Sequence, residues 1–117
     1  MNITINSDNT FNIKTNYGKY DNCYLEENYY YNGNKRYDIV SDGEPILTLT
    51  TNTDTVLQEN EISVKDYSEN EGILNAFIDA DLINPKIDYY IPSGFVRIPV
   101  VKTNKKFYTL VKAHEDI

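Results

Sequence analysis

The residues best suited to acid–base chemistry are four acids near a predicted helix: Glu69, Glu71, Asp79 and Asp81. Two convergent carboxylates can act as the acid and the base of a glycoside-hydrolysing site. Here, however, Ser68 and Glu71 have the spacing of a capping box, and Glu69 in the first turn suits the positive end of the helix dipole. Because helix formation accounts for two of these acids, we expect no catalytic carboxylate pair.

No other spacing of reactive residues indicates an enzyme or a bound cofactor. The single cysteine, Cys23, and the single histidine, His114, stand outside any Cys-x-x-Cys or His-x-x-x-His pattern, which predicts a buried thiol, an exposed imidazole and no metal site. Ser93-Gly94 is typical of a turn and lacks the Gly-x-Ser-x-Gly spacing of a nucleophile elbow. The five glycines do not form a phosphate-binding loop. We therefore predict a non-enzymatic protein with no catalytic residue, no cofactor and no metal.

Charge is distributed unevenly along the 117 residues, whose formal net charge is −7. Residues 1–53 carry −3, residues 54–88 carry −7 and residues 89–117 carry +3. Net acidity argues against direct binding of nucleic acid, because phosphate contacts need a basic surface. An acidic face instead steers a basic partner, since carboxylates can take the place of phosphates before Lys and Arg side chains. The plainer interpretation is a solvated surface that keeps the chain soluble.

Tyrosine is the other candidate for contact with a partner, with eleven residues in the chain. Its side chain supplies a large contact area at low entropic cost. Tyr and Asn also have A- and T-rich codons, so low-GC coding could account for part of their abundance. A stripe of small residues, Gly72, Ala76 and Ala80, is either a further contact or an ordinary exposed helix face. The predicted protein-binding residues are Asp66, Glu69, Asp79, Asp81, Tyr89 and Tyr90.

The N-terminal half has the pattern of paired β-strands. Apolar residues alternate over 3–5 and 11–13, on either side of Ser7-Asp8-Asn9, which predicts a hairpin. A second run, 23–31, ends at Asn32-Gly33, and Asn-Gly supplies the positive φ angles of a type I′ turn.

The chain then returns over residues 36–40, turns at Asp42-Gly43 and continues over 45–51. Pro45 suits the first residue of a strand. With the preceding run, these segments predict a three-stranded antiparallel meander.

One helix is predicted from Ser68, with its end before Asn84-Pro85. Its core face consists of Ile73, Leu74, Phe77, Ile78 and Leu82, which lie within one arc at helical spacing. Asp81 falls inside that arc, so either the helix ends near Ala80 or an acid is buried. Because an unpaired buried charge is costly, we expect the early end.

The C-terminal third is expected to be a loop over residues 89–94, a strand over 96–100, a last strand over 107–111 and a frayed tail over 114–117. Pro99 indicates an edge strand or a bulge. The fold class is then α+β, one domain over residues 1–117, with a mostly antiparallel sheet of about six to seven strands and one helix packed on it. There is no apolar run near ~18 residues and no signal-peptide pattern, so we expect a cytoplasmic protein without a membrane contact.

Three stretches resemble a known family: Asp42-Gly43-Glu44-Pro45 leading into Leu47 to Asn52, Lys65 to Leu74 with Glu-Asn-Glu-Gly at the helix start, and Ser93-Gly94-Phe95-Val96 leading into Ile98-Pro99-Val100. In this order and spacing they resemble domain-of-unknown-function family 4313, small proteins of bacteria and mobile elements. The resemblance covers residues 31–101. It implies a compact α+β domain and a plasmid or phage setting, and it transfers no site residue.

Two functions follow as hypotheses. The first is a small acidic protein-binding module of a mobile element or phage, an anti-defence inhibitor and nucleic-acid mimic that engages a basic nucleic-acid-handling host protein. The alternative is a self-associating structural or element-maintenance domain, whose edge strand near Pro99 pairs with another copy.

Overall fold

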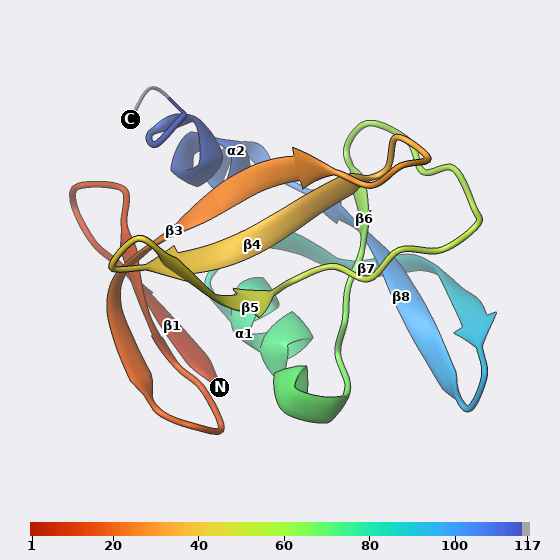
Figure 1. Ribbon diagram of the computed structural model, residues 1–117, viewed down its shortest axis with the longest axis horizontal. Helices are drawn as coiled ribbons and strands as arrows, with labels where there is room; N and C mark the ends of the chain where they lie inside the picture. Colours follow the sequence, from red (N-terminus) through yellow and green to blue (C-terminus); the bar gives the residue numbers. More distant parts are fainter. Residues whose placement is uncertain (116–117) are drawn as a thin grey trace.

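The computed structural model describes residues 1–115, which form two antiparallel sheets and three helical segments (Figure 1). The first sheet follows chain order: β1 (Asn2–Ile5), β2 (Phe11–Lys14), β3 (Lys19–Tyr29), β4 (Lys35–Ser41) and β5 (Glu44–Thr48). The second has the order β6–β8–β7 and consists of β6 (Glu61–Ser63), β7 (Ile83–Ser93) and β8 (Val96–Thr103). The helical segments are the 3₁₀-helix η1 (Ser68–Asn70), α1 (Ile73–Asp79) and α2 (Lys105–Lys112). The predicted α+β class and antiparallel pairing are confirmed, but the expected single sheet with one helix is two sheets, of five and three strands, with two α-helices.

The predicted N-terminal hairpin and the meander are both present, but the type I′ turn expected at Asn32-Gly33 is not. Only Gly33 of that pair has a positive φ, of 87°, and the link is a longer loop closed by the Tyr30 N–H donating to the Asn34 carbonyl. β1 pairs with β2 through Ile3 opposite Ile13, and β3, β4 and β5 pair in sequence. Asp42 and Gly43 have φ angles of 52° and 77° between β4 and β5, as a type I′ turn requires. Pro45 is the second residue of β5, a strand at the edge of the sheet, where its missing N–H leaves no ladder bond unmade.

Four aromatic rings link the first sheet to both helices. Phe107 of α2 lies 4.9 Å from Tyr37 of β4 and 6.3 Å from Phe77 of α1, measured between ring centroids. Phe77 in turn lies 6.4 Å from Phe11 of β2, and all four residues are fully buried. Edge-to-face pairs of this kind add to the stabilisation from burial alone. The core therefore depends on α2 as much as on α1.

The predicted capping box does not form. The chain makes a 3₁₀ turn at Ser68–Asn70, and α1 begins only after Gly72, whose φ of 95° interrupts the helix. Neither Ser68 nor Glu71 caps a helix through its side chain. Asp66 does so instead, since its Oδ1 accepts hydrogen bonds from the backbone N–H groups of Gly72 and Leu74, both at 3.1 Å. A left-handed residue at position 72 separates Ser68 from the helix that it was expected to cap.

The predicted early end of this helix is confirmed. α1 ends at Asp79, and Asp81 is exposed with a φ of 60°. The stripe of small residues is not an exposed face, because Ala76 is buried in the core and Gly72 precedes the helix. Ala76 thus serves internal packing and offers no contact to a partner.

Two predictions for the C-terminal third were wrong. Residues 89–94 are not a loop, because most of them belong to β7, which pairs with β8 from Ile83 to Ser93. Residues 107–111 are helical and lie within α2, whose first turn is capped by the Asn104 side chain accepting from the N–H of Phe107. α2 buries Phe107, Leu110 and Val111, which are at helical spacing. Packing against the core therefore outweighs the β-propensity of this run. The two strands expected over residues 96–100 and 107–111 are accordingly a strand followed by a helix.

Pro99 lies in the central strand of the second sheet, not in an edge strand. β8 pairs with β7 along its length, but β6 pairs only with residues 100–102 of β8. The Pro99 carbonyl accepts from Val64 N–H just beyond the end of β6, so the prolyl nitrogen faces the side where the third strand has ended.

The residues after α2 are partly packed against the body of the protein. The His114 imidazole stacks on Tyr24 with ring centroids 4.9 Å apart, and its Nε2 lies 3.1 Å from the Asn9 carbonyl oxygen. The predicted exposed imidazole is thus half-buried. The rest of the predicted frayed tail, residues 116–117, lies outside the described residues.

Candidate functional site

Two of the predicted contact acids already have partners inside the protein. Asp66 caps α1, as described above. Glu69 contacts Lys65, whose ammonium group donates to its carboxylate and lowers the pKa of Glu69 to about 2. A partner protein would have to displace these contacts, so both acids are weaker candidates than their charge alone indicates.

The other two predicted acids lie at the C-terminal end of α1, far from the predicted aromatic anchors. Asp79 and Asp81 are exposed there. Tyr89 and Tyr90 lie well along β7, and at about 3.3 Å per residue Tyr90 is roughly 20 Å from the start of that strand. The structure therefore does not gather the six predicted residues into one surface.

The two tyrosines belong to a different feature, which we call the arm: the part of the β7–β8 hairpin that extends beyond β6, residues 88–99. Figure 1 shows it projecting away from the body of the molecule, at the lower right. Cross-strand pairs continue from Tyr90 opposite Pro99 out to Ser93 opposite Val96, and Gly94 turns the chain with a φ of 59°. The arm is therefore a paired ribbon right up to its tip.

Phe95 is the most exposed large apolar side chain among the described residues, at 110 % of its reference surface. It lies at the tip of the arm, next to Gly94. Tyr89 and Tyr90 on the same arm are 39 % and 42 % exposed. Adjacent strand residues point to opposite faces, so these tyrosines present one ring on each face. The arm thus carries exposed aromatic area on both faces and at its end.

Charged groups next to the arm set its local polarity. The Arg97 guanidinium lies 4.3 Å from the centre of the Tyr90 ring, a cation–π contact. Partial burial, together with the Glu61 and Asp88 carboxylates, raises the pKa of the Tyr89 phenol, so Tyr89 is a neutral hydrogen-bond donor at physiological pH. Asp88 is itself 3.8 Å from Lys102. The arm is therefore aromatic with balanced charge and is not part of an acidic face.

Phe95 was not among the predicted contact residues, because its tip position depends on the pairing of β7. If residues 89–94 form a loop, as the sequence predicts, nothing indicates that Phe95, which follows Pro92-Ser93-Gly94, lies at the tip of a hairpin. The available signal was a turn followed immediately by a large aromatic residue between two strand-like runs.

The described residues offer little for metal or redox chemistry. Among residues 1–115, no three His, Cys, Asp or Glu side chains converge on a position that could hold a metal ion. The Cys23 thiol is buried as predicted, and burial raises its pKa, which makes it a poor nucleophile. Within the same residues no helix is long and apolar enough to cross a membrane.

Comparisons with protein-family models, curated proteins and solved structures find no match to the chain. The family resemblance described above stays a prediction.

Proposed function

We propose that this protein is a non-enzymatic protein-binding module and that the tip of the arm is its apolar anchor. The support is one observation: a phenylalanine side chain stands fully in solvent at the end of a paired two-stranded ribbon. Burying such a ring in a partner's apolar pocket is worth about 2 kcal/mol, or roughly 30-fold in Kd. Large aromatic residues at the centre of an interface often dominate its binding energy.

The arm is suited to this role because its anchor is held in place before binding. β8 continues from the arm into the buried body of the second sheet, where Val100 and Val101 are fully buried. A pre-ordered anchor loses less conformational entropy on binding than a flexible loop does. The overall charge of −7 adds long-range attraction to a basic partner, as the acidic composition predicts. An inhibitory role against host defence stays a prediction from the family resemblance.

Self-association is the competing use of the same region. The open edge of β7 carries Pro85, Lys86 and Pro92, and its register shifts between Ile83 and Ile87 and again before Tyr89. Prolines, a lysine and bulges at an edge are features that discourage pairing with another strand. They favour the arm as a contact for a different protein over pairing between copies.

The test compares the wild type with Phe95→Ala in affinity capture from a lysate of the source organism after nuclease treatment. Val56→Ala is the matched control, because Val56 is another exposed apolar residue, outside the arm. We expect a protein retained by the wild type and by Val56→Ala but lost with Phe95→Ala. Equal retention by all three proteins contradicts the proposal. Concentration-dependent sedimentation that Phe95→Ala abolishes would assign the arm to self-association.

A further inference from the structure

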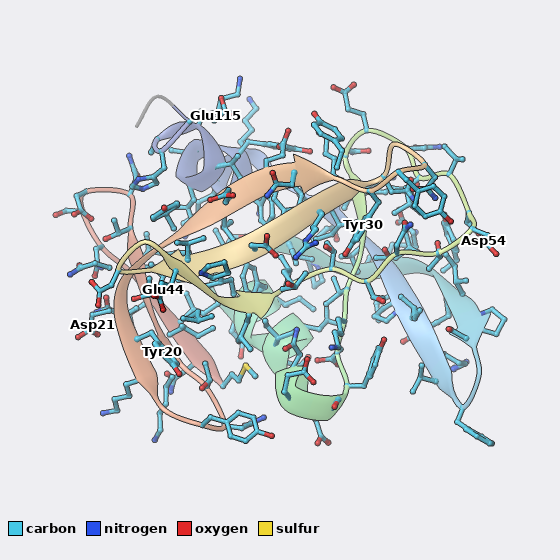
Figure 2. All side chains as sticks on the ribbon, in the orientation of Figure 1. Tyr20, Asp21, Tyr30, Glu44, Asp54 and Glu115 are labelled. Atoms are coloured by element: carbon cyan, nitrogen blue, oxygen red, sulfur yellow. The ribbon has the colours of Figure 1, made fainter. Side chains whose placement is uncertain are left out.

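A second candidate surface is a groove between β3 and α2. It has a volume of about 650 Å³, within the range of ligand sites. α2 presents Tyr108, Val111 and Lys112 to it at helical spacing, and β3 and β4 supply the facing wall. Figure 2 shows Glu115, another lining residue, just past the end of α2. The full lining is Glu27, Tyr29, Lys35, Glu59, Asn60, Tyr108, Val111, Lys112 and Glu115.

Glu27 is an acid on the inward face of the sheet. Cys23 and Leu25, which precede it at alternate positions of β3, are buried in the core, and Tyr37 lies directly across on β4. The Tyr37 phenol donates to Glu27 Oε2 at 2.8 Å, and the Tyr29 phenol donates to Oε1 at 3.1 Å. Both oxygens of the carboxylate are therefore held in position by phenols from two strands.

The two phenols also keep their protons. Burial and the hydrogen bond to Glu27 raise the pKa of Tyr37, and the same carboxylate raises the pKa of Tyr29. Each phenol is thus a neutral donor, and Glu27 is the charged acceptor between them. A phenol donor orients a carboxylate, but it does not neutralise its charge.

Glu27 nonetheless has no cationic partner among the described residues. The salt bridges of this part of the chain join Arg36 to Asp38, Lys65 to Glu69 and Lys102 to Asp88, and none includes Glu27. A half-buried carboxylate without a cation is electrostatically incomplete, because burial weakens its hydration. Two lysines line the groove, and the ammonium group of one of them, Lys35, lies over the Tyr108 ring at 5.2 Å from its centre.

The walls of the groove match a planar cation. Tyr29, which is 63 % exposed, lies on the strand wall, and the Tyr108 ring on the helix wall already attracts the Lys35 ammonium. Glu59 and Glu115 add carboxylates to the lining, and with Glu27 they outnumber the two lysines there, Lys35 and Lys112, by one. Guanidinium stacks on tyrosine rings and donates two parallel hydrogen bonds to one carboxylate, which ammonium cannot do. Arginine therefore fits this set of groups better than lysine.

We propose that the groove binds an arginine side chain of a basic partner protein, with its guanidinium donating to Glu27 between the rings of Tyr29 and Tyr108. This site goes beyond the proposed function, because it is separate from the arm and its occupancy does not depend on Phe95. It also gives the acidic character of the chain a specific contact, centred on Glu27, which lies outside the most acidic segment, residues 54–88.

The test is a titration of the full chain with the peptide Ac-Gly-Arg-Gly-NH₂, followed by ¹H–¹⁵N NMR. We expect shifts confined to the groove and a Kd near 1 mM, as for one charged side chain with stacking. The same peptide with citrulline, which has the shape of arginine but no charge, should bind at least tenfold more weakly. Glu27→Gln should weaken arginine binding at least fivefold, whereas Glu44→Gln, on β5 and labelled in Figure 2, should leave it unchanged.

Tyr29→Ala provides a second variant if Glu27→Gln perturbs the fold, because Tyr29 is largely exposed and its loss removes one wall of the groove. We expect at least threefold weaker binding. Absence of groove shifts at 10 mM peptide overturns the proposal, as does equal affinity for the citrulline peptide or equal affinity of folded Glu27→Gln. A Phe95→Ala variant that loses its captured partner but still binds the arginine peptide separates the two proposals.

Discussion

Replacing Asp66 by alanine should destabilise the protein through the start of α1. The Asp66 carboxylate accepts two backbone N–H groups at 3.1 Å, from Gly72 and Leu74. Loss of a helix cap costs ~0.5–2 kcal/mol, and hydrogen bonds to a charged acceptor lie at the upper end of such values. We therefore expect about 2 kcal/mol lower free energy of unfolding. For a domain of this size that corresponds to roughly 8 °C in Tm.

Urea unfolding followed by circular dichroism measures this difference directly. Asp66→Asn keeps an oxygen acceptor in place and should lose less than half as much stability. Asp79→Ala is the matched control, because Asp79 is exposed on the same helix and should change the free energy of unfolding by less than ~0.5 kcal/mol.

Substitutions at Ser68 and Glu71 distinguish capping of α1 by Asp66 from the predicted capping box. Ser68 and Glu71 make no side-chain cap in the structure, so alanine at either position should have little effect on stability. A loss at Ser68 or Glu71 as large as that at Asp66 would refute the reasoning and restore the capping box. Unchanged stability of Asp66→Ala would refute it equally.

Three further perturbations test other parts of the structure. Asn34→Ala should lower the free energy of unfolding by about 2–3 kcal/mol and speed hydrogen exchange in residues 52–57, because this buried side chain donates to and accepts from that loop. The carboxyl pKa of Glu69, measured by NMR, should rise from about 2 toward 4.5 in Lys65→Ala. Because the folded-state pKa of Glu69 is depressed, the Glu69 carboxylate stabilises the fold fully above pH 4.5, and this contribution is lost as pH falls toward 2. Acid unfolding of Lys65→Ala should show a smaller loss, since the backbone and Ser68 hydrogen bonds of Glu69 remain. Phe107→Ala should cost about 3–5 kcal/mol as a buried ring lost from the core, whereas Phe95→Ala should cost less than ~0.5 kcal/mol, both by urea unfolding.

The predicted hairpins are right because their signals are local. The turns at residues 6–10 and 42–43 depend on side chains and φ angles within a few residues of each other. The end of α1 near Ala80 was also predictable, because a buried aspartate would have been costly at position 81.

The errors come from contacts between residues distant in sequence. The β-propensity of residues 107–111 predicts a strand, yet these residues form part of α2, because Tyr37 and Phe77 supply the surface on which a helix buries Phe107. The second sheet obtains its third strand from β6, a three-residue segment that pairs with residues 100–102, about forty positions later in the chain. Neither the helical state of residues 107–111 nor the pairing of β6 with β8 can be predicted from a window of ten residues.

The candidate sites also combine features that local sequence predicts with features that depend on distant contacts. Tyr89 and Tyr90 were expected at the surface and are exposed, but their place on a projecting arm with Phe95 at its tip depends on the pairing of β7 with β8. Glu27 follows Cys23 and Leu25 in an alternating pattern, which was a signal for an inward-facing acid.

The acidic net charge, the turns at residues 6–10 and 42–43 and the α+β class follow from the sequence alone, since they depend on composition and on neighbouring residues. The tertiary structure decided which acids are already satisfied: Asp66 by a helix start, Glu69 by Lys65, and Glu27 by two phenols but no cation. The physical reason is that a carboxylate's availability depends on the groups that folding places around it, and for Glu27 those groups come from β3, β4 and α2.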